Sequence, residues 1–246
     1  MTPLTNLILS SLTTIFLFTT PTTANTEKAI FLAPPEINIP LVHPTLTDLP
    51  LDILTPHNTS TSAIRTKLTA SFPSSSQPKG TSTWLILDKL TPSQRYEVRI
   101  CWAATQPTSF TLTTYPLSEV FDTPDLITSL NTYSLTRLSQ SSAPLSQPPP
   151  QTQKGERQTS LLLLHIQSAA DYFASNATLM TNVPPVDVDI ILDPFLLNVL
   201  PRSLAPTVIY IIIVASASLF LSSKIASWVQ GLATSTSTED NEKKQQ

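Results

Sequence analysis

The sequence predicts a mainly β domain followed by a single C-terminal transmembrane helix. Short segments with alternating apolar residues, separated by Pro-rich turns, run through most of the chain. The stretch from Ser203 to Ser222 contains no charged residue. A helix rises about 1.5 Å per residue, so about 20 such residues cross a hydrocarbon core of about 30 Å. We therefore expect the β domain on one side of a membrane and a short polar tail on the other.

The N-terminal segment resembles a secretory signal peptide. Leu7 to Phe18 is apolar, and Thr22-Thr23-Ala24 offers small residues before Asn25. We expect residues 1–24 to be the signal and residues 25–202 to enter the lumen of the secretory pathway. The alternative is that the segment stays uncleaved as a second anchor, which leaves the same residues in the lumen.

The expected lumenal part contains two N-glycosylation sequons. They are Asn58-Thr59-Ser60 and Asn176-Ala177-Thr178. A glycosylated asparagine lies on the surface of a secreted or lumenal protein. We therefore expect glycans at Asn58 and Asn176, consistent with the predicted topology.

Composition excludes several classes of function. Charged residues make up 13% of the chain and the net charge is -3, so no basic surface for nucleic acid is expected. Gly80 and Gly155 are the two glycines of the lumenal part, and neither lies in a nucleotide-binding motif. Cys101 is the one cysteine, so no intrachain disulfide forms. An apolar core, alone or with a partner, must then hold the domain together.

The β elements are predicted from alternation and from the prolines that bound them. One apolar face recurs in each of six segments, 29–33, 36–39, 63–72, 83–87, 95–102 and 109–115. Residues 42–56 contain several prolines and are expected to be irregular. In the strand at 63–72, Arg65 and Lys67 belong to the polar face. In the strand at 95–102, Glu97, Arg99 and Cys101 do.

The clearest local pattern surrounds Tyr96. Leu90-Thr91-Pro92 precedes a Tyr-x-Val-x-Ile strand. This resembles the corner of fibronectin type III domains, where a tyrosine near the start of a strand bonds to the upstream backbone. With 109–115 as the next strand of a hairpin, we expect an immunoglobulin- or fibronectin-III-like lumenal sandwich over residues 25–138.

Residues after the predicted hairpin form three parts. Asp122-Thr123-Pro124-Asp125 is a helix-start signature, and the helix is expected to run to about Leu138. Residues 139–159 are rich in Pro, Gln and Ser and predict a loop or linker. Residues 160–202 then form a lumenal β and juxtamembrane segment, with an apolar run at 161–166, a helix starting at 169–173 and a strand at 186–192. Its last stretch, Asp193 to Pro201, is expected to be interfacial or to contact another membrane protein.

The tail, residues 223–246, is expected to be cytosolic. Lys243 and Lys244 occupy the fourth and third positions from the C-terminus. This placement matches the dilysine pattern of type I proteins that a retrieval coat returns to the endoplasmic reticulum, a receptor-read address. We therefore expect a single-pass type I protein of the endoplasmic reticulum membrane.

No constellation of residues predicts catalysis. His43, His57 and His165 share no metal-ligand spacing, and His165 lies in an apolar run typical of a core residue. Asp187-Val188-Asp189 matches a DxD metal motif, but in an alternating strand the two carboxylates belong to the solvated face. No catalytic, cofactor-binding or metal site is expected, and the chain is not expected to be an enzyme.

Two stretches of the sequence resemble a known family. They are NTEKAIFLAPPEINIP, Asn25 to Pro40, and DPFLLNVLPRSLAPTVIYIII, Asp193 to Ile213. Together with the topology, they resemble the fungal co-activator subunit of GPI mannosyltransferase II. The resemblance implies a non-catalytic accessory subunit without a cofactor. Its partner would be a multispanning mannosyltransferase that adds the second mannose to the GPI precursor from dolichol-phosphate mannose.

The span carries a patch of small residues where a partner helix can pack closely. The patch consists of Ala215, Ser216, Ala217 and Ser218. The alternative is that these residues face lipid. A second function from another class also remains open: a lumenal interaction module, such as a cargo receptor or a chaperone-like subunit of another complex in the endoplasmic reticulum membrane.

Overall fold

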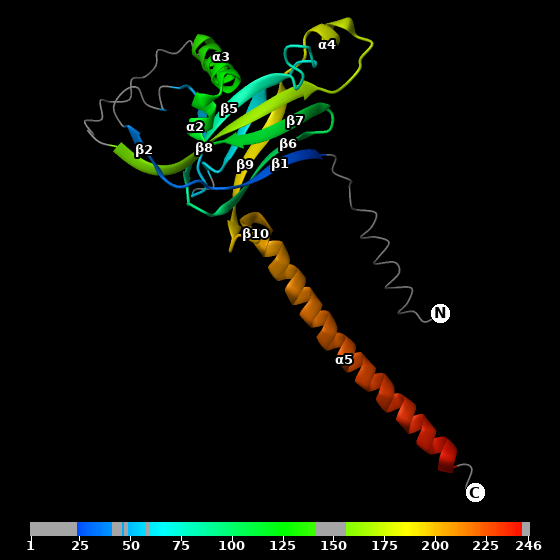
Figure 1. Cartoon of the computed structure of the whole chain (residues 1–246). Coiled ribbons are helices and arrows are strands. Elements are labelled where there is room, and N and C mark those ends of the chain that lie inside the picture. The colour runs from blue at the N-terminus through cyan, green and yellow to red at the C-terminus, as the bar shows by residue number, and fades with distance from the viewer. Residues whose placement is uncertain (1–23, 41–45, 47–48, 58–59, 141–155, 243–246) are drawn as a thin grey trace. The chain divides into compact units, whose positions relative to one another are not determined.

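The computed structural model describes residues 24–40, 46, 49–57, 60–140 and 156–242 (Figure 1). The chain divides into two compact units, one up to Pro194 and one from Phe195 onward. The described strands form two five-stranded sheets, and all of them except β10 and the end of β9 belong to the first unit. The mainly β prediction is confirmed. The expected signal peptide, apart from Ala24, and Asn58, His43, Lys243 and Lys244 lie outside the described residues.

The first sheet contains four antiparallel strands of the first unit, in the order β1-β6-β9-β4. Their bounds are β1 Ala24–Leu32, β4 Ala63–Leu68, β6 Arg95–Ala103 and β9 Val186–Leu196. Side chains alternate along each strand, and in β9 the buried positions include Val186, Val188, Ile190 and Leu192. The alternation predicted for this strand is confirmed.

The second sheet is organised around one long strand, β8. It pairs with β5 along one edge and with β2 and β7 along the other, while β3 runs parallel to β5. The bounds are β2 Ile37–Pro40, β3 Asp52–Leu54, β5 Thr81–Leu90, β7 Thr108–Tyr115 and β8 Glu156–Ala170. Gly80 precedes β5 with φ of 77°, and a Cβ there would lie 2.0 Å from the Ser168 carbonyl oxygen. Only glycine is accommodated at this approach.

The inner faces of the two sheets share one hydrophobic core. It includes Tyr96, Val98 and Ile100 of β6 and Leu162 and Leu164 of β8. A sandwich of this kind packs its sheets about 10 Å apart and buries alternate residues of each strand. The shared core is therefore what holds together a domain without an intrachain disulfide.

The corner at Tyr96 is confirmed. The Tyr96 hydroxyl accepts a hydrogen bond from the Thr91 backbone N–H at 3.0 Å and donates one to Gln94 Oε1 at 2.9 Å. The ring is buried and stacks on Phe31 of β1, with ring centroids 5.8 Å apart. The tyrosine thus ties the loop before β6 to the first sheet.

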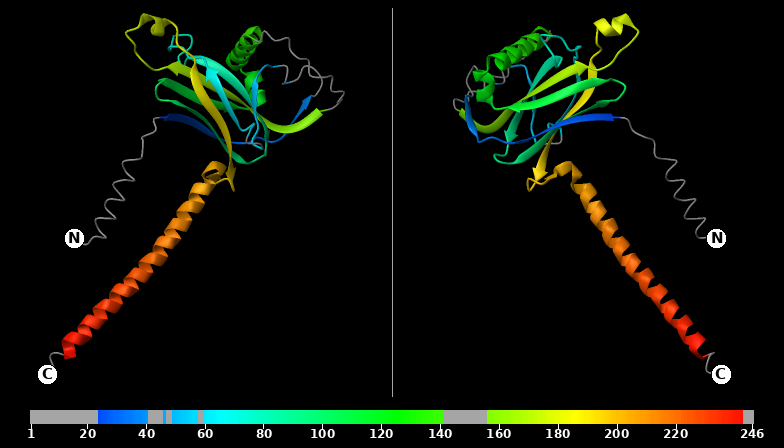
Figure 2. Two further views of the ribbon diagram at one scale, coloured as in Figure 1. Left: turned by 180° about the vertical axis from the view of Figure 1, so that it is seen from behind. Right: turned by 45° about the vertical axis from the view of Figure 1, so that its right-hand side comes forward.

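Two helices cover the outer face of the second sheet (Figure 2). They are α2, Leu117–Asp122, and α3, Pro124–Gln140, and α3 begins at the proline that the sequence placed in its first turn. Beneath them lies a second core made by Trp84 and Ile86 of β5, Leu163 of β8, Val120 of α2 and Leu130 of α3. Strands β5 and β8 are therefore apolar on both faces, a pattern typical of strands covered on both sides.

The structure corrects four expectations. Strands β6 and β7 lie in different sheets, so the hairpin expected from 95–102 and 109–115 is wrong. Residues 156–159 of the expected loop or linker at 139–159 belong to β8, which pairs with β2, β5 and β7 of the preceding part of the chain. Residues 52–54 form β3 within a stretch expected to be irregular. Residues 169–170 end β8, and the helix near the second sequon is α4, Ala177–Thr181.

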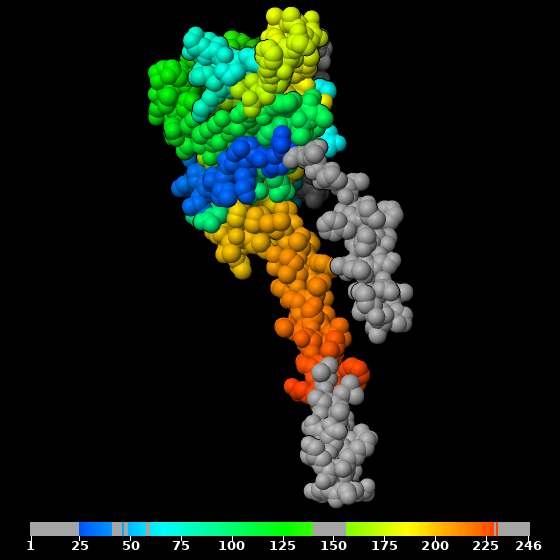
Figure 3. All heavy atoms as spheres, turned by 90° about the vertical axis from the view of Figure 1, so that its right-hand side faces the viewer, coloured from blue at the N-terminus to red at the C-terminus, as the bar shows by residue number. Residues whose placement is uncertain are grey.

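The second unit contains the end of β9, β10 (Leu200–Pro201), a 3-10 turn (η2, Arg202–Leu204) and the long helix α5 (Ala205–Glu242). Residues Arg202–Trp228 are long and apolar enough to cross a membrane, and none of the apolar window is buried. On the part of α5 that Figure 3 draws in colour, the side chains project from the helix and are exposed. The helix continues past the predicted end at Ser222, since no proline interrupts it after Pro206.

Candidate interaction surfaces

The β9–β10 hairpin exposes apolar side chains at its turn. Leu197 is 95% exposed and Val199 is 78% exposed. The turn closes with a hydrogen bond from the Val199 N–H to the Leu196 carbonyl oxygen at 3.1 Å. Leu197 and Asn198 have φ of 51° and 57°, and a leucine in this left-handed region is strained. The turn is therefore a candidate contact surface.

Part of the small-residue patch of α5 lies on one side of the helix, because consecutive helical residues are about 100° apart and only Ala215 and Ser218 of the four are neighbours. Ala215, Ser218 and Ser222 follow the i, i+3, i+7 spacing of one helix side, and all three are exposed. The Ser216 hydroxyl donates to the Ile212 carbonyl oxygen at 2.8 Å, within its own helix. Small side chains of this kind let a second helix approach closely between the longer ones.

The two aspartates of the DxD match are engaged in ion pairs on the outer face of the first sheet. Arg65 donates through two nitrogens to both carboxylate oxygens of Asp189 at 2.7 Å, and Lys67 Nζ lies 2.7 Å from Asp187 Oδ1. The hydrogen bond from Arg65 holds the pKa of Asp189 below its ordinary value, and the same pair raises the pKa of Arg65. The interpretation of these carboxylates as a solvated strand face is confirmed.

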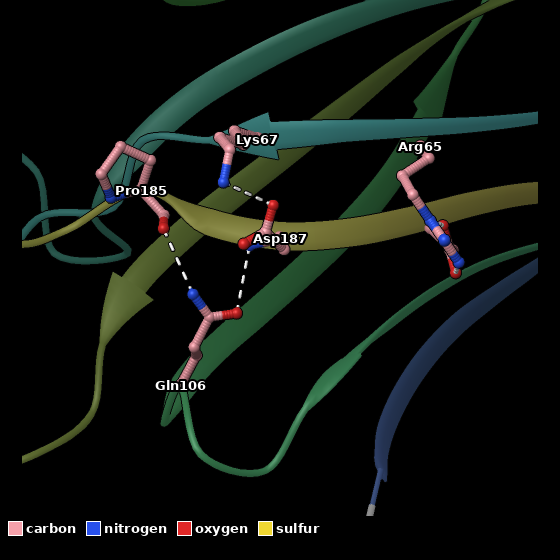
Figure 4. Close-up of polar contacts among 6 residues, drawn as sticks. Arg65, Lys67, Gln106, Pro185 and Asp187 are labelled. Carbon is pink, nitrogen blue, oxygen red and sulfur yellow. Dashed lines mark hydrogen bonds and ion pairs between the residues drawn. The ribbon is translucent and has the colours of Figure 1, made fainter.

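Gln106 clamps the start of β9, a role that sequence reasoning missed (Figure 4). Its side-chain oxygen accepts from the Asp187 backbone N–H at 3.1 Å, and its nitrogen donates to the Pro185 carbonyl oxygen at 3.3 Å. Both bonds join segments 79 and 81 residues apart. The side chain of Gln106 thereby completes the backbone pairing at a strand end, which is a structural task.

His165 is a buried residue of the second sheet, as its apolar run predicts. The ring stacks on Trp84 with centroids 4.2 Å apart, and Nε2 lies 2.9 Å from the Ser82 hydroxyl. Burial, aided by the charge of Lys79, lowers the pKa of His165 to about 4. His57 is exposed. Among the described residues, no group of three or more His, Cys, Asp or Glu is arranged to hold a metal ion.

Cys101 and Asn176, which the sequence singled out, each take part in a hydrogen bond. Cys101 is half-buried, and the Thr26 hydroxyl donates to its sulfur at 3.5 Å. Asn176 is exposed and caps α4, since its side-chain oxygen accepts from the Thr178 N–H at 3.0 Å. The side-chain nitrogen of an asparagine is the atom that a glycan would occupy, and the cap uses the oxygen instead.

A polar cleft of about 770 Å³ lies between α3, the second sheet and the loop that follows β4. One wall is the face of α3 that carries Thr128, Thr132 and Thr136, and His165 and Ser82 contribute from the sheet. Asp52 and Arg137 line it as well, joined by a 3.0 Å hydrogen bond. Sequence reasoning missed this cleft. Its available signal was the four-residue spacing of threonines along the predicted helix.

Comparison with known protein families gives one match. A model of the Pga1 family, described as GPI-mannosyltransferase II co-activator, matches residues 15–225. The match spans all the strands of the sandwich and most of the candidate membrane span. No curated protein and no solved structure matches the chain.

Proposed function

Because the chain belongs to the family of GPI-mannosyltransferase II co-activators, we propose that it is a non-catalytic accessory subunit of that enzyme. The enzyme is a mannosyltransferase of the endoplasmic reticulum membrane that adds the second mannose during assembly of the GPI precursor. The observation that carries the proposal is the family match over residues 15–225. The ion-paired aspartates of β9 support it, because they are engaged with Arg65 and Lys67.

The proposed topology is single-pass type I. Residues 1–24 serve as the signal peptide, the sandwich is lumenal, α5 spans the membrane, and the tail is cytosolic. Asn58 and Asn176 carry glycans, and a retrieval coat binds Lys243 and Lys244. Support comes from the apolar helix at Arg202–Trp228 and from the exposure of Asn176. Replacing both lysines with serine tests retrieval: the protein should leave the endoplasmic reticulum, and unchanged localisation would contradict the retrieval signal.

The partner contact is proposed to lie in the second unit. Within the patch Ala215, Ser216, Ala217 and Ser218, the side that carries Ala215 and Ser218 would pack against a helix of the multispanning subunit, and the β9–β10 turn would lie at the membrane surface. Support comes from the small side chains of the patch and from the apolar exposure of Leu197 and Val199. These two features leave apolar surface without cover in the isolated chain.

The test is a mild-detergent pull-down from microsomes, with partners identified by mass spectrometry. We expect a multispanning mannosyltransferase as the dominant partner. Leucine at both Ala215 and Ser218 should weaken its recovery without changing localisation, because bulk prevents close helix approach. Phe220→Leu, on the opposite side of α5, is the matched control and should leave recovery unchanged. Undiminished recovery of the double variant would contradict the proposed face, and diverse secretory cargo in place of a transferase would favour a sorting receptor.

The relation of the sandwich to immunoglobulin and fibronectin type III domains is part of the proposal. The corner at Tyr96 supports it. The parallel pairing of β3 with β5 and the separation of β6 from β7 depart from that pattern. An experimental structure of the lumenal part tests it through the strand order.

A further inference from the structure

The polar cleft of the first unit has the features of a sugar site. We infer that it binds a neutral hexopyranoside, contributed by the lipid-linked glycan on which the partner enzyme acts. The source of the sugar rests on the proposed function, whereas the chemistry of the cleft does not. Its volume of about 770 Å³ lies within the range of small-ligand sites, about 300–1,000 Å³.

The α3 wall offers a row of hydrogen-bond acceptors. The hydroxyls of Thr128, Thr132 and Thr136 donate to the carbonyl oxygens of Pro124, Thr128 and Thr132 at 2.7, 2.8 and 2.8 Å. Each hydroxyl hydrogen is therefore used within the helix, and the lone pairs of each oxygen remain available. A row of acceptors at one-turn spacing suits a ligand that carries several hydroxyl donors.

Donors lie beside this row. Ser129 Oγ accepts from the Trp84 indole N–H at 3.1 Å, so its own hydrogen is available to a ligand. At the far end of α3, Arg137 Nη2 donates to Asp52 Oδ1 at 3.0 Å, and the two side chains are 37% and 33% exposed. An adjacent carboxylate and guanidinium supply an acceptor and a donor side by side, which matches two neighbouring hydroxyls of a pyranose ring.

Aromatic rings complete the lining. Tyr133 shares the end of the cleft with Asp52 and Arg137. On the sheet side, His165 stacks on Trp84 and contacts Ser82. Tyr133 thus combines a ring surface with a polar atom, and a pyranose likewise has C–H faces and a polar rim.

The charge of the cleft favours a neutral ligand over a phosphate. Its ionised lining residues are two acids, Asp52 and Asp125, and two bases, Lys67 and Arg137. Lys67 and Arg137 are already paired, with Asp187 and Asp52. A phosphate site would present unpaired cations or several convergent backbone N–H groups. The sugar part of a lipid-linked glycan fits this balance better than its phosphate groups do.

Saturation-transfer NMR on the full-length protein tests the inference. The protein is held in a detergent without a sugar headgroup, and the probe is methyl α-D-mannopyranoside. We expect transfer to the ring protons of the probe. Thr132→Val and Tyr133→Phe should each weaken binding about three- to tenfold, since each removes one hydrogen-bonding group. Thr111→Val, on β7 outside the cleft, is the control and should bind as the unsubstituted protein does.

The outcomes separate this inference from the proposed function. If the unsubstituted protein shows no transfer, or if both cleft variants bind as the control does, the sugar site is refuted. Preferential binding of inositol phosphate over the mannoside would refute it as well. Pull-down of the transferase by the cleft variants reports on the proposed function alone, because the span and the β9–β10 turn are unchanged in them. Normal pull-down with weakened mannoside binding is the expected combination.

Discussion

The outer faces of the two sheets differ in the side chains that they carry and in what covers them. The outer face of the first sheet carries ion pairs, Arg65 with Asp189, Lys67 with Asp187, and Glu97 with both Lys28 and Arg99. The outer face of the second sheet is apolar at Trp84, Ile86 and Leu163 and is covered by α2 and α3. Between α3 and this second sheet lies the polar cleft.

The two outer faces are therefore expected to contribute differently to the free energy of unfolding and to ligand binding. Exposed ion pairs contribute little to the free energy of unfolding, because water already solvates the separated charges. A second apolar core contributes through its buried area and its packing. The first sheet is therefore expected to tolerate changes at its exposed pairs, Arg65 with Asp189 and Lys67 with Asp187, but not at the buried Glu97. The second sheet is not expected to tolerate changes on its outer face. The cleft, set on rigid elements of the second sheet, is the surface suited to a ligand.

The largest effect is expected from removing the centre of the second core. Trp84→Ala deletes a fully buried ring, its stack on His165 and its bond to Ser129. We expect the free energy of unfolding to fall by about 3–5 kcal/mol. Chemical denaturation of the detergent-solubilised protein measures this. Trp228→Ala, at a ring that is 67% exposed, is the control and should change little. An equal loss of unfolding free energy in Trp84→Ala and Trp228→Ala would contradict the stabilising role of the second core.

The next largest effect is expected from pH. Burial holds the pKa of His165 at about 4, against 6.5 for a free imidazole. Between these two values, the unfolded chain binds a proton that the folded chain does not. The free energy of unfolding is therefore highest above pH 6.5 and falls as the pH drops toward 4, by up to ~3 kcal/mol.

The variant His165→Gln checks this origin, because glutamine does not titrate. Denaturation midpoints between pH 4 and 7 should depend less on pH in His165→Gln than in the unsubstituted protein. His57→Gln, at an exposed position, is the matched control and should retain the full slope. A slope that survives in His165→Gln would assign the pH dependence to another group.

A smaller effect is expected from the inner face of the first sheet. Tyr96→Phe removes the hydroxyl that accepts from the Thr91 N–H and donates to Gln94. We expect a loss of about 1–2 kcal/mol in the free energy of unfolding, because the Thr91 donor is left without its partner. Tyr172→Phe, whose hydroxyl bonds to Leu179 on an exposed segment, should cost less. Thermal unfolding of the two variants side by side decides this.

The smallest effect is expected on the outer face of the first sheet. Lys67→Met and Asp187→Ala remove the two partners of an exposed ion pair. We expect the unfolding midpoint of each variant to match that of the unsubstituted protein at physiological salt, because the pair is screened. A clear destabilisation by either change would contradict the interpretation of this pair as a screened surface contact.

Local patterns determined several features of this chain. Period-two alternation placed Arg65, Lys67 and the two aspartates on one outer face, since successive side chains of a strand point to opposite sides. Pro124 marked the start of α3, and the Leu-x-Pro-to-Tyr pattern marked the corner at Tyr96. The apolar run at Ser203–Ser222 predicted the long helix. Each of these depends on residues within about one element.

Pairing between distant segments was decided by the tertiary structure. Ile37 lies opposite Thr159 and Thr108 opposite Ala170, and no local pattern in either segment names its partner. Alternation gives a strand two faces, but it does not say which sheet the strand joins. For this reason, β6 and β7 were expected in one hairpin and lie in two sheets.

The polar cleft shows the same division. The sequence determined that Thr128, Thr132 and Thr136 share a side of one helix, because a helix repeats every 3.6 residues. Only the fold brought that side opposite His165 and Ser82 and joined Arg137 to Asp52, 85 residues earlier in the chain. The shape of the cleft depends on how α3 packs over the second core, and packing is a property of the whole set of contacting side chains.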